Sequence, residues 1–355
     1  MSRDRRLART LCALGALCAI TAAPARAQTA AEPAKSSPVT VGGVVYAQYL
    51  YQLRDTAGHA NNFDVTRAYL TVSGKLSGGL STRVTADIFR DDDGSLAYRL
   101  KYAYFSYAPH GSALAFKLGQ MHTPLIEWEE TLWEYRMQGR VALDRAGYET
   151  SSDFGAGVDG SWHQDAVNMQ AGIYNGEGYN KAPGDKRKDV MARMSLRLAG
   201  SDDSSRVGGL RLTGYAHVGK PTGGGRRNRL LGMLSYRSKL FTLAAEYARL
   251  EDRLDNPPLP AVPDDATTTG RIVSAFGVFH VPRSRAALIG RMDVTDPDTH
   301  AADDRQTRLI AGVSWQLTPN LRLLADVDHV SYEGGPTPAE YAEGTQGLFQ
   351  VQVTF

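Results

Sequence analysis

Three acidic side chains form a regular series in the segment 122–152, which we call the insertion. Glu127, Glu130 and Glu134 are spaced three and four residues apart. On a helix, this spacing places all three carboxylates on one face. A fixed row of carboxylates can attract cations, repel anions, or pair with basic side chains across a narrow opening. The series therefore predicts charge selection rather than bond-making chemistry.

The rest of the insertion has the features of a short helix that docks on another surface. Thr123 is placed to cap the helix and Pro124 suits its first position. An apolar and aromatic face lies opposite the acidic one: Leu125, Trp128, Leu132 and Tyr135. Basic side chains follow and are further candidates for the same constriction: Arg136, Arg140 and Arg145. The alternative is a surface loop that faces outward and restricts no passage.

No arrangement typical of catalysis or metal binding accompanies these residues. There is no nucleophile elbow, no His-Glu-x-x-His pattern and no paired zinc-ligand spacing. The run 91–94 and the pair Asp326 and Asp328 suggest calcium, but neither has the remaining ligands of a twelve-residue calcium loop. The sequence predicts no catalytic residue, no metal and no cofactor.

Residues 1–27 have the pattern of a secretory signal peptide. A basic start is followed by a short apolar run and by Ala25-Arg26-Ala27, which predicts cleavage after Ala27. The alternative is a short N-terminal membrane anchor. Removing residues 1–27 takes away five Arg, one Asp and both cysteines, and leaves 35 basic against 37 acidic side chains. The resulting net charge of −2 is not that of a nucleic-acid-binding protein, so we expect no nucleic-acid partner. Residues 28–38 form a flexible linker.

Residues 39–355 alternate apolar and polar side chains almost throughout, apart from the insertion. This period of two predicts sixteen strands, each long enough to cross a bilayer when tilted. The predicted strands are 39–52, 62–76, 79–90, 96–108, 112–121, 153–163, 166–175, 188–199, 208–219, 228–237, 240–251, 270–281, 285–296, 305–318, 320–333 and 345–355. Long and short connections also alternate, as in outer-membrane barrels. One short-side connection, Gly200 to Val207, is longer than the others.

The alternation also predicts which side chains face a wet interior. A charge at the bilayer midplane costs about 2–4 kcal/mol, so charged rows must face inward. The basic inward candidates are Arg67, Arg83, Arg99, Lys101, Arg193, Arg197, Arg211, Arg291, Arg308 and Arg322. The acidic ones are Asp87, Asp159, Asp293, Asp326 and Asp328. Two alternatives are a soluble sheet with a charged face, and wall charges that merely pair with each other.

Several motifs together resemble those of Gram-negative porins, and more narrowly the phosphate-selective porin O and P family. The motifs are the strand 63–70 (FDVTRAYL), the passage 119–124 (GQMHTP), the strands 153–160 and 171–176, and the terminal 351–355 (VQVTF). The resemblance implies a homotrimer of barrels in outer-membrane lipid, with the insertion as a third loop folded into the lumen. It also implies that the barrel-assembly machinery reads Phe355.

The main hypothesis is an all-β transmembrane barrel that lets small polar solutes diffuse passively, with anion or phosphate preference left open. The lysine-poor loops and the Glu-rich insertion depart from the phosphate specialists of that family. The alternatives are a non-conducting structural or adhesive barrel and a barrel-embedded acyl hydrolase.

Overall fold

The computed structural model shows a closed antiparallel β-barrel with one long insertion. It describes residues 39–54, 60–91, 93–182, 184, 186–221, 225–252, 267–333 and 344–355. The predicted signal peptide and linker, residues 1–38, lie outside this part of the chain. The strands are β1 (Val39–Gln52), β2 (Asn61–Lys75), β3 (Leu80–Arg90), β4 (Leu96–Tyr107), β5 (Leu114–His122), β6 (Ser152–Trp162), β7 (Val167–Tyr174), β8 (Asp189–Ala199), β9 (Gly209–Gly219), β10 (Arg227–Arg237), β11 (Phe241–Asp252), β12 (Thr268–His280), β13 (Ala286–Asp296), β14 (Gln306–Thr318), β15 (Leu321–Tyr332) and β16 (Gly344–Thr354). A short 3-10 turn, η1 (Ser77–Gly79), joins β2 to β3.

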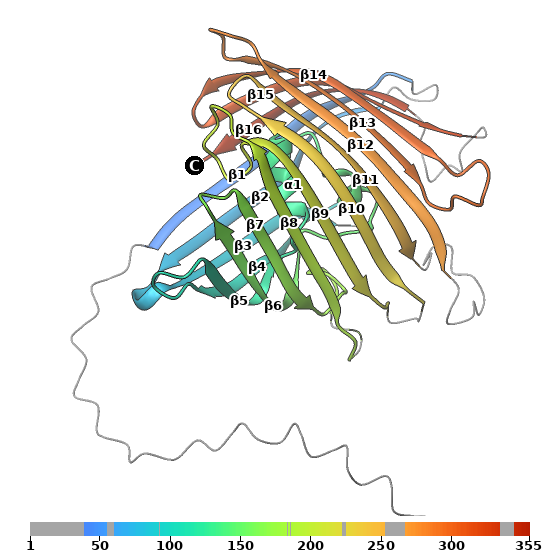
Figure 1. The fold of residues 1–355 in the computed structure, drawn as a ribbon. Coiled ribbons are helices and arrows are strands. Elements are labelled where there is room, and N and C mark those ends of the chain that lie inside the picture. The colour runs from blue at the N-terminus through green and yellow to red at the C-terminus, as the bar shows by residue number, and fades with distance from the viewer. Residues whose placement is uncertain are drawn as a thin grey trace, which may run out of the picture. The chain divides into compact units, whose positions relative to one another are not determined.

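Each strand pairs with its neighbours in chain order, and β16 closes the sheet against β1 (Figure 1). The closing register runs from Val44 opposite Thr354 to Gln52 opposite Gln346. Closure gives every strand two neighbours, which is the requirement for a sheet surrounded by lipid, although β4 pairs with β5 only from Ala103 to Tyr107. The prediction of sixteen strands is confirmed, and the strand ends differ from those predicted by at most two residues.

The two faces of the wall differ as the alternation predicted. On β8, Val190 and Met194 are 52% and 47% exposed, whereas Arg193 between them is 3% exposed. The alternation of exposed and buried positions continues on β9 to β11, where the buried row contains both polar and apolar side chains. We call the row that holds Arg193 the inner row. No helix in the described residues is long and apolar enough to span a membrane.

The insertion forms two helices, α1 (Ile126–Trp133) and α2 (Ala142–Arg145). The predicted helix is confirmed, but its predicted cap at Thr123 was wrong, because α1 has no side-chain cap. The Thr123 hydroxyl instead contacts the carbonyl oxygen of Thr150. This contact joins the two ends of the insertion. Thr123 therefore connects these ends and does not cap α1.

The insertion packs on the inner row of strands that lie far apart around the barrel. Arg193 on β8 donates from Nε to the carbonyl oxygen of Pro124 at 2.9 Å. The Tyr135 hydroxyl lies 2.6 Å from Oγ of Ser314 on β14. Gln350 on β16 donates to another carbonyl oxygen of the insertion at 3.0 Å. The buried apolar cluster of the protein joins these insertion residues to the wall.

A β-bulge between β3 and β4 interrupts the ladder beside the insertion. Thr85 lies opposite Tyr102 and Ala86 opposite Leu100, so Lys101 is the extra residue. A bulge lets two consecutive side chains leave the strict alternation. Both Lys101 and Tyr102 are buried, at 4% and 5% exposure, and both line the cavity described next.

Candidate functional site

A cavity of about 570 Å³ lies between α1 and one arc of the wall; we call it the α1 cavity. Its lining comes from β1 to β5, α1 and the residues that follow it, and the C-terminal end of β16. The charged members of the lining are Arg83, Lys101, Glu127, Glu130, Glu134 and Arg136. Sequence reasoning had selected all six as candidates, and the fold places them around one opening.

The aromatic face of α1 holds the helix against the opposite arc of the wall. Trp128 and Trp133 are both fully buried. The guanidinium carbon of Arg193 lies 4.0 Å from the Trp128 ring centre, a cation–π distance. Trp133 meets Phe276 on β12 edge-to-face, with ring centres 5.3 Å apart. Packing α1 on this side leaves the α1 cavity open on the other.

The acidic face of α1 points into the cavity, but each carboxylate has an arginine partner. Glu130 accepts a hydrogen bond from Nε of Arg136 at 2.7 Å. Glu127 pairs with Arg206 and Glu134 with Arg237. The three carboxylates are therefore compensated locally.

The basic side chains on the facing wall lack such compensation. Arg83 donates to Oγ1 of Thr85 at 3.1 Å, and its Nη1 lies 3.2 Å from Nε2 of His122. The Lys101 ammonium lies 3.3 Å from the Tyr69 hydroxyl and 4.5 Å from the centre of its ring. Within the described residues, neither Arg83 nor Lys101 has a carboxylate at ion-pair distance. The cavity therefore has a surplus of positive charge on its wall.

A second basic group lies nearer the long-loop end of the same arc. Asp87 is fully buried and pairs with Arg67 at 3.1 Å and with Arg99 at 2.9 Å. The Arg99 guanidinium carbon lies 3.7 Å from the Phe89 ring centre and 4.6 Å from that of Tyr179. These contacts fix both arginines in place on the wall.

The other predicted side chains lie away from the α1 cavity. Arg193 and Arg211 stack near Trp128, and Arg291 pairs with Asp293 at 2.9 Å. The remaining predicted arginines contact carboxylates or backbone carbonyl oxygens elsewhere: Arg140 with Asp144, Arg145 and Arg308 with Asp328, Arg197 with Gln164, and Arg322 with Glu134. They hold the insertion and the turns in position.

A buried network fastens the C-terminal end of the insertion to the wall. Nδ1 of His217 lies 2.7 Å from Glu149, and Nε2 lies 2.9 Å from Asp189. A histidine can donate from both ring nitrogens only when protonated. The geometry therefore indicates an imidazolium between two carboxylates. The Tyr215 hydroxyl adds a bond of 2.9 Å to Glu149, so the network has charge-assisted strength.

The insertion also contains ionisable groups with displaced pKa values. Burial alone would raise the pKa of Glu127, but Arg206 and His122 lower it to about 2. Burial, followed by repulsion from Arg291 and other cations, lowers the pKa of Arg145 to about 9. Glu127 thus remains ionised through the neutral and mildly acidic range.

Sequence reasoning missed several residues around the cavity. Tyr46 and Tyr69 line it from the inner row, and alternation from Arg67 could have placed Tyr69 there. The roles of Arg206 and Arg237 were also missed. The one signal for Arg206 was the unusual length of its connection. Among the described residues, no cluster of three or more His, Cys, Asp or Glu side chains could hold a metal.

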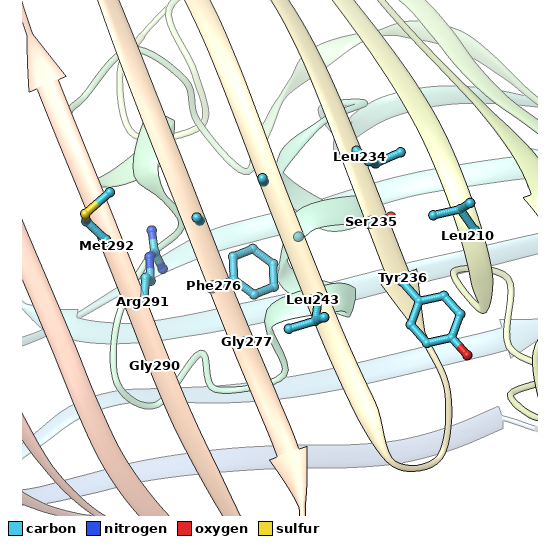
Figure 2. Close-up of a pocket in the computed structure, with 13 residues that line it drawn as sticks. Leu210, Leu234, Ser235, Tyr236, Leu243, Phe276, Gly277, Gly290, Arg291 and Met292 are labelled. Atoms are coloured by element: carbon cyan, nitrogen blue, oxygen red, sulfur yellow. The ribbon is translucent and has the colours of Figure 1, made fainter.

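A different cavity, of about 620 Å³, lies on the other face of the wall across β9 to β13. Figure 2 shows its side chains on neighbouring strands, with Leu234, Leu243 and Met292 among them. These three are exposed apolar residues, and Arg291 at its floor has a side chain only 1% exposed. A groove whose exposed side chains are apolar fits hydrocarbon rather than a polar solute.

A family model described as Gram-negative porin matches residues 13–335 of this chain. An anion-selective porin from Comamonas acidovorans has a similar fold, with a TM-score of 0.66 and 13% identity over 90% of this chain and 100% of that one. OmpF of Salmonella typhi matches with a TM-score of 0.65 and 12% identity, over 90% and 98% of the two chains. OmpT of Vibrio cholerae matches with a TM-score of 0.61 and 11% identity, over 91% and 99%. No curated protein sequence matches the chain significantly.

Proposed function

Because this chain belongs to the Gram-negative porin family, and is therefore an outer-membrane barrel, we propose that it passes small anionic solutes through the α1 cavity. Transport is passive diffusion, with no catalysis and no cofactor. The observation that carries the proposal is the uncompensated pair Arg83 and Lys101 on the cavity wall.

We place the insertion in the lumen as its constriction. Its contacts with β8, β14 and β16 support this placement, because those strands lie far apart around a closed barrel. Contacts of one segment with all three strands through the inner row support a course across the interior. The α1 cavity is then the passage left beside the segment.

Anion preference follows from the charge balance around this passage. Five basic side chains lie at the α1 cavity or pair with its lining, against its three carboxylates and Asp203, which shares Arg237 with Glu134. A surplus of fixed positive charge raises the local anion concentration and lowers the barrier for anion entry. The fold resembles that of a porin named as anion-selective, which agrees with this expectation.

Reversal potential in a planar bilayer under a salt gradient tests the proposal. The wild type should conduct and favour anions. The double variant Arg83→Gln with Lys101→Gln should lose most of that preference, because it removes both uncompensated charges. Arg249→Gln is the matched control, because Arg249 lies on the exposed row of β11, with its side chain 59% exposed. It should behave as the wild type.

Three results would contradict parts of this proposal. Absence of any conductance from folded protein would leave a structural or adhesive barrel. Cation preference in the wild type would indicate that the carboxylates of α1, rather than Arg83 and Lys101, determine ion selectivity. Release of fatty acid from lipid would favour the acyl hydrolase. Block of the chloride current by added phosphate would extend the anion preference to phosphate selectivity.

We also propose a homotrimer whose assembly in the membrane uses Phe355 as a signal. OmpT of Vibrio cholerae has a trimer form and a similar fold, with a TM-score of 0.59, 12% identity and coverage of 90% of this chain. The mass of the detergent-solubilised protein, measured by light scattering with correction for detergent, tests the trimer. A monomer mass for freshly extracted protein would contradict it.

A further inference from the structure

The connection between β8 and β9, residues 200–208, is longer than the neighbouring short-side turn at Ser238 and Lys239, and it reaches the insertion. Val207 in this connection is fully buried. Ser201 donates to the Arg237 carbonyl oxygen at 2.6 Å, which fixes the connection against the end of β10. The short-turn end of an outer-membrane barrel faces the periplasm. The connection therefore approaches α1 from the periplasmic side.

Arg206 joins this connection to the acidic face of α1. Its Nη2 pairs with Glu127 and also lies 3.2 Å from Oγ1 of Thr131. Thr131 Oγ1 in turn donates to the Glu127 carbonyl oxygen at 2.7 Å. The guanidinium carbon is 5.6 Å from the Trp128 ring centre. Arg206 thus contacts three side chains of α1, those of Glu127, Trp128 and Thr131, while its own side chain remains partly exposed.

Arg237 makes the equivalent contact at the other end of α1. It pairs with Glu134, and its Nη1 donates to the Thr131 carbonyl oxygen at 2.7 Å. Its Nε donates to Asp203 of the connection, also at 2.7 Å. Asp203 itself accepts from the Ser205 backbone nitrogen at 2.7 Å, so the arginine is held from both sides.

These contacts mean that two of the three cavity carboxylates pair with arginines from outside the insertion, although Arg237 is shared between Glu134 and Asp203. Glu130 is the exception, because its partner Arg136 follows α1 directly. Without Arg206 and Arg237, the carboxylates of α1 would face Arg83 and Lys101 with a nearly equal charge. The surplus of positive charge then depends on the periplasmic connection.

We propose that Arg206 and Arg237 are specificity-determining residues: Arg206 neutralises Glu127, Arg237 partly compensates Glu134, and together they allow the basic wall to select anions. This inference rests on the proposed anion preference. It assigns the control of selectivity to a periplasmic connection and a strand end that the passing solute need not touch.

A charge-cancellation series on one pair tests the inference by reversal potential. Arg206→Gln should lower the anion-to-cation permeability ratio by about 25-fold, because one uncompensated unit charge about 4 Å away in water changes the permeability of each ion by about fivefold, in opposite directions. Glu127→Gln should raise the ratio, because it frees the charge of Arg206. The double variant should return close to the wild type, and Arg206→Lys should keep most of the wild-type preference.

Arg285→Gln is the matched control at the same end of the barrel. Arg285 donates to the Leu317 carbonyl oxygen and has no carboxylate partner among the described residues. It should leave the permeability ratio unchanged. A purely structural role for Arg206 predicts a different pattern, in which Arg206→Gln changes conductance and the added Glu127→Gln does not restore selectivity.

The inference is overturned if folded Arg206→Gln retains the wild-type ratio, or if the double variant is no closer to the wild type than Arg206→Gln. If Arg206→Gln does not fold, Glu127→Gln alone decides, because an unchanged ratio in that variant contradicts the inference. A wild type without anion preference contradicts the proposed function instead. In that case, shifts of the anion-to-cation permeability ratio in opposite directions in Arg206→Gln and Glu127→Gln would still show that this pair controls ion selectivity.

Discussion

Replacing Trp133 by alanine should release the insertion while the barrel remains folded. The side chain is fully buried, and its ring centre lies 5.3 Å from that of Phe276 and 5.7 Å from that of Tyr135. A buried Trp→Ala substitution costs about 3–5 kcal/mol. The strand ladders do not involve this side chain, so the loss falls on the docking of α1. The population of undocked insertion should rise by about a hundredfold to several thousandfold.

Limited digestion with trypsin in detergent measures this population. Cleavage at the insertion arginines requires undocking, and its rate follows the open population when reclosing is fast. The heat-induced shift in gel mobility should show that Trp133→Ala still forms a barrel. Trp315→Ala is the control, because Trp315 is 46% exposed on the outward row of β14. A digestion rate for Trp133→Ala within about twofold of the wild type would refute the reasoning.

Three further predictions concern the wall, the anchor of the insertion and assembly. Gly119→Ala should lower the thermal unfolding midpoint, because φ is +122° and a Cβ would lie 2.4 Å from a backbone oxygen; Gly290→Ala, with open space around it, should not. Burial would raise the pKa of Glu149, but His217 and its neighbours lower it below the ordinary glutamate value of 4.5. The contact between Glu149 and His217 should therefore persist at pH 4.5 and be lost only at lower pH. Hydrogen exchange of 142–151, corrected for pH, should locate this loss, and loosening at or above pH 4.5 would contradict it. Deleting Phe355 should reduce membrane assembly in cells but leave refolding in detergent intact; equal yields in cells would count against the assembly signal.

The wall could be predicted from sequence because lipid enforces its alternation. In the pairing of β8 with β9, Arg193 lies opposite Tyr215 on the inner row, and an error of one residue would expose the arginine to lipid. The same constraint favours inward arginines on the other strands, although Arg249 lies on the exposed row of β11, so parity alone does not place every arginine. The bulge at Lys101 could not be predicted, because it is a property of the pairing between two strands rather than of either sequence.

The insertion was only partly predictable, because its contacts join residues far apart in the chain. Helical spacing placed Glu127 and Glu130 on one face of α1. It could not show that Thr123 contacts Thr150, since that choice depends on where the insertion returns to the wall. The pairing of Arg206 with Glu127 likewise depends on the direction in which a connection folds.

Because α1 packs on one arc of the wall, substitutions in the two arcs of the barrel should have different effects. Strands β1 to β4 border the α1 cavity, whereas β11 and β12 carry contacts with α1. Substitutions of the lining side chains on the first arc would change the charge around the α1 cavity. Substitutions on the second arc would change how firmly α1 is docked on the wall, and hence the noise of the ionic current.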